Sequence, residues 1–232
     1  MTRRELLFAA GGAAFAQRPA APWNFVFILI DDLGWTDLGC FGSTFYRTPN
    51  IDRLAAQGMR FTNAYAACPV CSPTRAAVLT GKYPARLHVT DWIPGRTPPG
   101  LRFRVPEWTQ HVPLEEVTIA ETLKPVGYTS ASIGKWHLGG PEFYPEKQGF
   151  DLNVAGTEAG SPPSYFVPYR ISTLKDGPRG EYVTDRLTGE ALHFLDGTGG
   201  RPFFLYLPHF AVHTPIQAKK EITDSYRARV RG

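Results

Sequence analysis

Short apolar runs alternate along the chain with segments whose apolar residues recur at helical spacing. The run from Asn24 to Ile30 ends at two aspartates, a pattern typical of a buried parallel strand. Phe203–Leu207 predicts another buried strand, and Tyr128–Ile133 is expected to be a strand that leads into Gly134. Another strand is expected over Met59–Tyr65, where apolar and polar positions alternate.

Four helices are predicted between these strands. The first has Thr48 as its cap and Pro49 in its first position. The others are expected from Cys71 to Gly81, over Val117–Leu123 and over Glu181–Leu195. Because strands alternate with helices, the sequence predicts an α/β fold whose mainly parallel sheet is flanked by helices.

Two longer stretches interrupt this alternation. Ile93–Pro113 is rich in proline, arginine and aromatic residues, and Gly156–Gly180 is rich in glycine, proline, serine and tyrosine. Both are predicted to be ordered surface loops at the rim of a site, where substrate selection usually resides. The basic C-terminal segment Tyr226–Gly232 is compatible with a solvated helix face.

Composition narrows the possible function classes. The chain has 232 residues, of which 43% are hydrophobic, enough for one sizeable globular domain. Its net charge is +4, but no dense run of lysines and arginines is interleaved with aromatics, so no nucleic-acid partner is expected. Its three cysteines are an odd number, which argues against a disulfide framework.

The N-terminus has the pattern of an export signal. Arg3 and Arg4 precede an uncharged stretch that ends at a small-x-small cleavage site, Ala14-Phe15-Ala16. This stretch is too short to span a bilayer as a helix, so no stable membrane anchor is expected. The paired arginines favour a twin-arginine signal, with an ordinary secretory signal as the alternative. We therefore expect residues 1–16 to be a signal peptide, residues 17–232 to be the mature chain, and the protein to be periplasmic or secreted.

The segment Cys71-Ser72-Pro73-Thr74-Arg75 is the most informative in the chain. Pro73 suits the first turn of a helix, so Cys71 lies at the helix N-terminus, where free N–H groups favour an anion. Arg75 follows about one turn later and can stabilise an oxyanion. One alternative is a buried cysteine before an ordinary helix. Another is a redox motif, since Cys68-Pro69-Val70-Cys71 is a C-x-x-C, but that interpretation leaves Arg75 unexplained.

Asp31 and Asp32 follow the first strand, at the edge of the sheet where ligands of α/β proteins gather. Two adjacent carboxylates repel each other unless a cation joins them, and hard oxygen ligands suit Ca²⁺ or Mg²⁺. A solvated turn is the alternative, because aspartate is common after strands. Asp37 is expected to be structural.

Two other strand ends carry titratable groups. Lys135 and His137 follow the second strand and, in an extended segment, would point the same way. An ammonium beside an imidazole suits an oxyanion and a proton transfer. His213 follows the third strand, whereas His209 is nearer the strand end and is interpreted as a packing residue. A surface lysine and a packed histidine are the alternative for Lys135 and His137.

In chain order, these segments resemble the type I formylglycine-dependent sulfatases. The resemblance covers residues 23–217 and implies an alkaline-phosphatase-like α/β fold that hydrolyses sulfate esters, such as those of sulfated carbohydrates. It rests on Asp31-Asp32, Cys71-x-Pro73-x-Arg75 with Leu79-Thr80-Gly81, Gly134-Lys135-Trp136-His137-Leu138-Gly139, and His213-Thr214-Pro215.

The resemblance implies a modification and a metal. A maturation enzyme would oxidise Cys71 to formylglycine, whose hydrate attacks sulfur. Ca²⁺, or less readily Mg²⁺, would be bound by Asp31, Asp32 and the converted Cys71.

The resemblance also implies roles for four other side chains. Arg75 and Lys135 would polarise the hydrate, and His137 would take the proton that expels sulfate. Lys135 and His213 would hold the sulfate, with His213 placed to help the leaving oxygen.

The sequence departs from the family after His213. Type I sulfatases are about twice this length, beyond one ordinary domain. They carry an Asp-Asn metal pair and a late lysine downstream of the His-Thr-Pro segment. Here Asp224 is the one aspartate after His213, no asparagine follows, and Lys219 and Lys220 come too early. We therefore interpret residues 17–232 as the N-terminal part of a sulfatase catalytic domain, truncated before the C-terminal subdomain. A phosphate or phosphonate ester hydrolase on the same scaffold, or an inactive remnant, are the alternatives.

Overall fold

A four-stranded parallel sheet forms the centre of the protein. The computed structural model describes residues 22–227 and 229–230, so the expected signal peptide of residues 1–16 lies outside the described residues. The strand order is β1-β4-β2-β3, and every pairing is parallel, which confirms the expected sheet. The strands are β1 (Phe25–Ile30), β2 (Thr129–Ile133), β3 (Leu152–Val154) and β4 (Phe203–His209).

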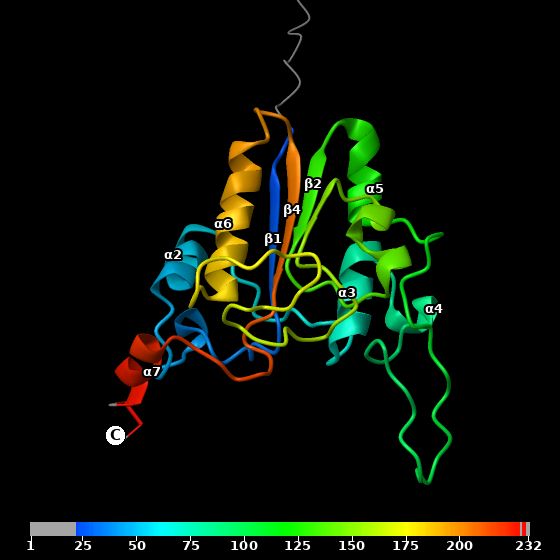
Figure 1. The fold of residues 1–232 in the computed structure, drawn as a ribbon, viewed down its shortest axis with the longest axis horizontal. Helices are drawn as coiled ribbons and strands as arrows, with labels where there is room; N and C mark the ends of the chain where they lie inside the picture. Colours follow the sequence, from blue (N-terminus) through cyan, green and yellow to red (C-terminus); the bar gives the residue numbers. More distant parts are fainter. Residues whose placement is uncertain (1–21, 228, 231–232) are drawn as a thin grey trace, which may run out of the picture.

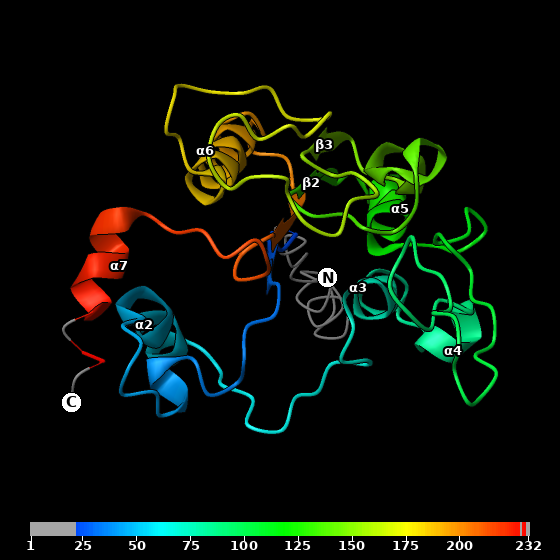
Figure 2. The same cartoon turned by 60° about the horizontal axis from the view of Figure 1, so that its bottom comes forward.

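Helices flank this sheet on both sides (Figure 1). Helix α6 lies on one side, and α5 and α3 lie on the other, while α2 and α7 stand side by side further out (Figures 1 and 2). None of the helices in the described residues combines the length and the apolar character needed to cross a membrane. The helices are α2 (Pro49–Gln57), α3 (Cys71–Thr80), α4 (Pro84–Leu87), α5 (Ile119–Leu123), α6 (Val183–Asp196) and α7 (Lys220–Arg227).

The elements differ from the sequence expectations in a few places. The strand expected over Met59–Tyr65 is wrong: this stretch has no regular structure, and the side chains of Met59, Phe61 and Tyr65 are exposed. Alternation alone does not make a strand, because a strand also needs a neighbour to complete its backbone hydrogen bonds. Strand β3, with three residues, and helix α4, with four, are too short to show a period in the sequence.

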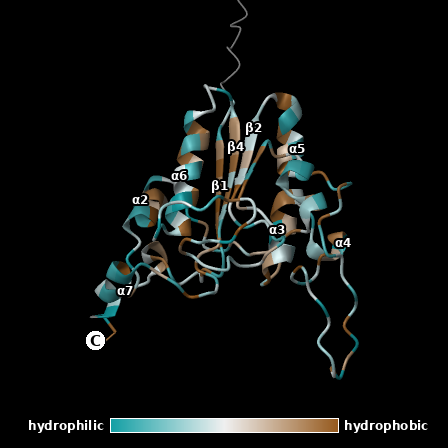
Figure 3. Ribbon diagram, viewed as in Figure 1, coloured by the Kyte–Doolittle hydropathy of each residue, from teal (hydrophilic) through white to brown (hydrophobic). Residues whose placement is uncertain are grey.

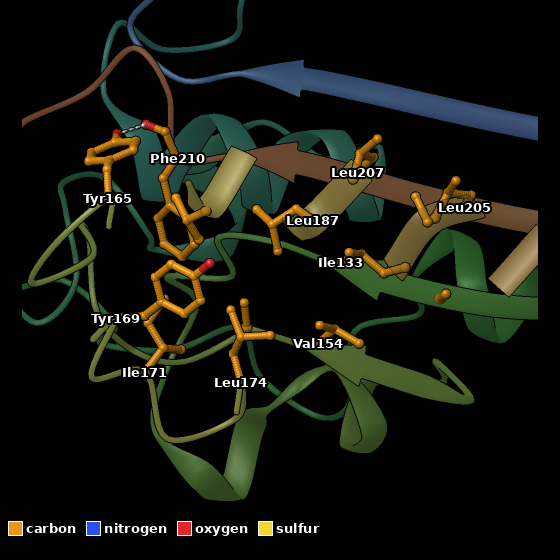
Figure 4. Packing of buried hydrophobic residues seen from close by; sticks show 14 residues of the cluster. Ile133, Val154, Tyr165, Tyr169, Ile171, Leu174, Leu187, Leu205, Leu207 and Phe210 are labelled. Atoms are coloured by element: carbon orange, nitrogen blue, oxygen red, sulfur yellow. Dashed lines mark hydrogen bonds between the residues drawn. The ribbon is translucent and has the colours of Figure 1, made fainter. Parts of the chain in front are cut away.

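Two apolar clusters hold the sheet and helices together. One fills the space between the sheet, α6 and the loop before it (Figure 4). The other packs the opposite face of the sheet against α3 and α5. The first cluster includes Ile133, Leu187, Leu205 and Leu207, and the second includes Leu79, Ala120, Trp136, Phe150 and Phe204.

Strand β1 carries apolar side chains on both of its faces, but these side chains are covered only in part. Its sequence is Phe-Val-Phe-Ile-Leu-Ile, and its ribbon is coloured as hydrophobic in Figure 3. Phe25, Val26 and Ile28 are nevertheless 45%, 50% and 53% exposed. Within the described residues β1 pairs only with β4, so its other edge carries no neighbouring strand.

Candidate active site

Three strand ends meet at one edge of the sheet and deliver polar residues there. The Asp31 N–H after β1 donates to the Ala211 carbonyl (2.9 Å) beyond β4, and the Lys135 N–H after β2 donates to the Pro208 carbonyl (2.8 Å). Gly134 has a φ of 130°, and a Cβ there would lie 2.0 Å from the Pro208 carbonyl oxygen. Glycine is therefore required where β2 passes closest to β4.

Helix α3 begins at Cys71, as the sequence predicts. Val70 before it is extended, and Gly81 after it closes the helix in the left-handed conformation. The Cys71 thiol is half-buried and free, as is that of Cys68. The Ser72 hydroxyl is fully buried and accepts a hydrogen bond from the Ile93 N–H (3.1 Å), which fixes the following loop to the start of the helix.

A buried ion cluster joins the strand ends to this helix. Lys135 Nζ lies 2.5 Å from Asp31 Oδ2, and Arg75 Nη2 lies 3.3 Å from Asp31 Oδ1. Arg75 Nη1 also donates to the Lys135 carbonyl (2.9 Å). All three side chains are at least 95% buried. Two cations therefore share one carboxylate in a region shielded from water, where an unpaired charge is costly.

Several buried polar atoms in this region have no partner among the described residues. They are Nε and Nη2 of Arg75, the hydroxyl of Tyr206 and Nδ1 of His137. Arg75 Nη2 is within ion-pair distance of Asp31 but lacks hydrogen-bond geometry. Buried donors are nearly always satisfied in folded proteins, so these guanidinium hydrogens, on a side chain one turn after Cys71 in α3, can serve a further acceptor.

Burial and mutual repulsion shift the pKa values of Lys135 and His137. Desolvation is the main cause that lowers the pKa of Lys135, and the charge of Arg75 lowers it further, while Asp31 acts in the opposite direction. Desolvation, followed by the charges of Lys135 and Arg75, lowers the pKa of His137 to about 3. The imidazole is therefore neutral at physiological pH and can accept a proton.

The local backbone around His137 differs from the expectation. Residues 135–137 are not an extended strand, because His137 has a left-handed φ of 62°. Its N–H donates to the Thr157 carbonyl (2.9 Å), and a Cβ on Gly160 would lie 2.7 Å from its Cε1 atom. The loop of residues 156–180 therefore packs directly on the imidazole. Lys135 and His137 come together through a turn rather than through strand alternation.

Asp32 and His213 form the exposed side of the site. Asp32 has a left-handed φ of 61°, and its side chain is 64% exposed. His213 Nε2 lies 3.7 Å from Asp32 Oδ2. The hydroxyl of Tyr165 lies within hydrogen-bond distance of the carbonyls of Phe210 (2.7 Å) and His213 (2.8 Å), and its single proton is donated to one or shared between them, which holds the His213 segment in place.

The remaining candidates lie outside this cluster. His209 is buried on β4, and burial lowers its pKa, in keeping with its interpretation as a packing residue. Asp37 accepts a hydrogen bond from the Gly34 N–H (2.8 Å) within a turn, which is a structural role.

The fold thus brings Asp31, Arg75, Lys135 and His137 together in the interior, with Asp32 and His213 at the surface. Tyr206 and Tyr165 were missed by sequence reasoning. Both look like ordinary core tyrosines, and no spacing in the sequence distinguishes them.

The donor set fits part of a shell for a hard cation. Asp31 and Asp32 supply carboxylate oxygens next to the start of α3, which suits Ca²⁺. Among the described residues, however, no group of three or more His, Cys, Asp or Glu side chains lies together as metal ligands do. Asp31 is neutralised by Lys135 and Arg75 instead.

Comparison with known proteins identifies the family. The family model named Sulfatase matches residues 23–231. The chain belongs to the sulfatase family. This sulfatase is 37% identical over 249 residues to N-acetylgalactosamine-6-sulfatase of Mus musculus, across 97% of this chain and 46% of the relative. It is 47% identical over 151 residues to arylsulfatase A of Homo sapiens, across 64% of this chain and 27% of the relative.

Solved structures show the same similarity and confirm the alkaline-phosphatase-like fold. Ps i-CgsB in complex with k-i-k-neocarrahexaose aligns with a TM-score of 0.73 and 33% identity, across 88% of this chain and 48% of that one. A protein in complex with its substrate D-glucosamine-2-N,6-O-disulfate aligns with a TM-score of 0.66 and 26% identity, across 88% and 37%. This sulfatase spans about half the length of the curated relatives it matches.

Proposed function

We propose that this sulfatase hydrolyses sulfate esters of carbohydrates at the site around Cys71. The observation that carries the proposal is the position of Cys71 at the start of α3, one helical turn from a buried arginine whose Nε and Nη2 make no hydrogen bond within the described residues. Similarity to an N-acetylgalactosamine-6-sulfatase and to a protein crystallised with a disulfated glucosamine supports a sugar substrate.

Oxidation of Cys71 to formylglycine by a maturation enzyme would supply an aldehyde hydrate as the nucleophile toward sulfur. The side chains around it have separate tasks. Arg75 and Lys135 place two positive charges where the oxygens of the sulfate would lie, against the single negative charge of Asp31. Because the cluster is buried, these charges act strongly on charge that develops in the transition state.

The two histidines are suited to proton transfers at different depths. His137 is buried and neutral, with an unpartnered Nδ1, so it can accept a proton beside the start of α3. His213 lies at the exposed rim beside Asp32, where the oxygen of a leaving sugar would emerge. Here it would stabilise or protonate that oxygen.

A Ca²⁺ ion held by Asp31, Asp32 and the converted Cys71 would neutralise the sulfate and orient it. In this proposal the remaining oxygen ligands come from outside the described residues, because two carboxylates cannot complete a shell of six to eight. The paired arginines and small-x-small site at residues 1–16 support export to the periplasm or the medium.

Cys71 itself provides the direct test of the proposed chemistry. A peptide that spans residue 71 should be roughly 18 Da lighter than the thiol form after co-expression with a maturation enzyme, since an aldehyde replaces the thiol. Cys71→Ala should abolish release of sulfate from a sulfated sugar without changing the circular dichroism spectrum. Phosphate release from the matched phosphate ester, with no sulfate release, would instead favour a phosphate ester hydrolase. Sulfate release by Cys71→Ala would contradict the mechanism.

Calcium affinity tests the proposed metal ligands. Calorimetry should show weak Ca²⁺ binding to this chain, because only Asp31 and Asp32 contribute carboxylates, and Asp31→Ala with Asp32→Ala should remove it. Asp37→Ala is the control, since Asp37 is engaged in its own turn. Tight stoichiometric binding by this chain would show that further ligands lie within it.

A further inference from the structure

A long arm projects from the protein beside the proposed active site. It lies between α4 and α5 and extends beyond the carboxyl edge of the sheet, away from the rest of the molecule (Figure 1). Every residue from 96 to 107 is exposed. No regular secondary structure is present in this stretch, so packing within the chain does not explain its composition.

The composition of the arm is cationic and aromatic. Arg96, Arg102 and Arg104 are all exposed, and the guanidinium of Arg102 lies 5.7 Å from the ring centroid of Phe103. The side chain of Phe103 is 77% exposed. Arginines bind sulfate oxygens through paired N–H groups, and an open aromatic face stacks on the apolar face of a sugar ring.

The base of the arm forms a polar hollow. Two hydrogen bonds join the outgoing and returning sides of the arm here: Gly95 N–H donates to Gln110 Oε1 (2.7 Å), and Trp108 Nε1 donates to the Trp92 carbonyl (3.1 Å). The hollow has a volume of about 410 Å³ and combines an indole with amide, carboxylate, hydroxyl and guanidinium groups, a set that suits a carbohydrate. It is lined by Gly95, Arg96, Thr97, Glu107, Trp108 and Gln110.

The arm is anchored to the residues of the active site. Ile93 is buried, and its N–H donates to the hydroxyl of Ser72, the neighbour of Cys71. On the returning side the Val112 N–H donates to the Leu138 carbonyl (3.1 Å), next to His137. A sugar chain bound along the arm would therefore lead toward the proposed active site around Cys71.

We propose that this arm, through Arg96, Arg102, Arg104 and Phe103, binds a sulfated polysaccharide at sugar units other than the one that reacts. The inference rests on the proposed function for its substrate class and extends it from isolated sugar sulfates to polymers. Binding along the arm needs no turnover, so it can be measured apart from catalysis.

The test compares oligosaccharides that differ only in sulfation. Calorimetry on the full chain should show binding of a chondroitin 6-sulfate octasaccharide, and at least about tenfold weaker binding of unsulfated chondroitin of the same length. Affinity should fall steeply as salt rises from about 50 to about 200 mM, as expected when cations are released from a polyanion. Replacing Arg96, Arg102 and Arg104 by Gln should lower the affinity about tenfold and flatten the salt dependence.

A matched control removes the same charge elsewhere. Arg53, Lys220 and Arg227 are exposed on α2 and α7, on the opposite side of the molecule from the arm, and their replacement by Gln should leave binding unchanged (Figure 1). Circular dichroism should report the same fold for both triple variants, because none of these arginines or lysines is buried. Phe103→Ala should weaken binding without altering the salt dependence.

Two outcomes would overturn the proposal: equal affinity of the arm variant and the wild type, or an equal loss in the control variant. Equal binding of a DNA oligonucleotide of the same charge would assign the arm to polyanions in general and overturn the carbohydrate assignment.

Turnover of 4-nitrophenyl sulfate separates the two proposals. If the proposed function fails, no variant releases sulfate, whereas failure of the arm proposal leaves sulfate release intact and octasaccharide binding unchanged by the arginine substitutions.

Discussion

One buried carboxylate organises the site at the scale of single residues. Asp31 faces Lys135 and Arg75, so the cluster holds two positive charges and one negative charge, and neutral His137 adds none. The proposed sulfate substrate would bring the negative charge that this arrangement leaves uncompensated. Nε and Nη2 of Arg75 make no hydrogen bond within the described residues and would be available to its oxygens.

Buried histidines make the stability of the fold sensitive to acid. Burial lowers the pKa of His209 below its ordinary value of about 6.5, so between the two values the unfolded chain binds more protons. The contribution of His209 to the free energy of unfolding should therefore be fully present above about pH 6.5. Below that pH it should fall, by at most about 1.4 kcal/mol per pH unit for one histidine. His209→Gln should reduce the difference between urea unfolding at pH 5 and at pH 7.5.

His137 should contribute in the same direction, because its pKa of about 3 in the folded state is also lowered. His193→Gln is the control, since His193 is exposed on α6. An unchanged pH difference in His209→Gln would show that His209 is protonated without unfolding.

At the scale of elements, two glycines control where the active-site helices and strands end. Gly81 closes α3 and Gly134 ends β2, and both have a positive φ. They differ in their surroundings: a Cβ on Gly81 meets nothing within 4 Å, whereas a Cβ on Gly134 would collide with the backbone of β4.

Alanine substitution should separate backbone strain from steric collision. Gly81→Ala should cost about 1 kcal/mol of unfolding free energy from the left-handed backbone alone. Gly134→Ala should cost about 3 kcal/mol or more, because β2 and β4 must also move apart. Urea unfolding of both variants measures the difference. Equal losses would mean that the two strands separate freely, so that Lys135 and Pro208 are not fixed against each other.

At the scale of the whole molecule, β1 is the least protected part of the sheet. Its residues are apolar on both faces, as in strands that lie inside a sheet, yet one edge and much of both faces are exposed in the described residues. An exposed, apolar strand edge is a site for association with another chain.

The isolated chain should therefore self-associate as its concentration rises. Val26→Lys with Ile28→Lys places two charges on one face of β1 and should shift the population to monomer in sedimentation velocity experiments. Leu192→Lys on α6, where Leu192 is 57% exposed, should have no such effect. A wild-type chain that stays monomeric at every concentration would show that β1 is covered by another part of the protein.

The sequence by itself determined the order of the chemical segments and the elements with a clear period. Three strands, four helices and the position of Cys71 at the start of α3 follow from patterns within short stretches, because periodicity and turn residues act locally. The sulfatase family follows from the same segments, and the comparisons confirm it.

Only the tertiary structure decided which groups meet. Lys135 pairs with Asp31 across 104 positions, and this contact, together with that of Arg75, neutralises Asp31. The alternating stretch Met59–Tyr65 finds no partner strand, while the three residues of β3 do. The left-handed turn at His137 and the unpaired hydroxyl of Tyr206 likewise depend on distant neighbours. Contacts between remote segments are set by packing of the whole chain, and such packing leaves no period in the sequence.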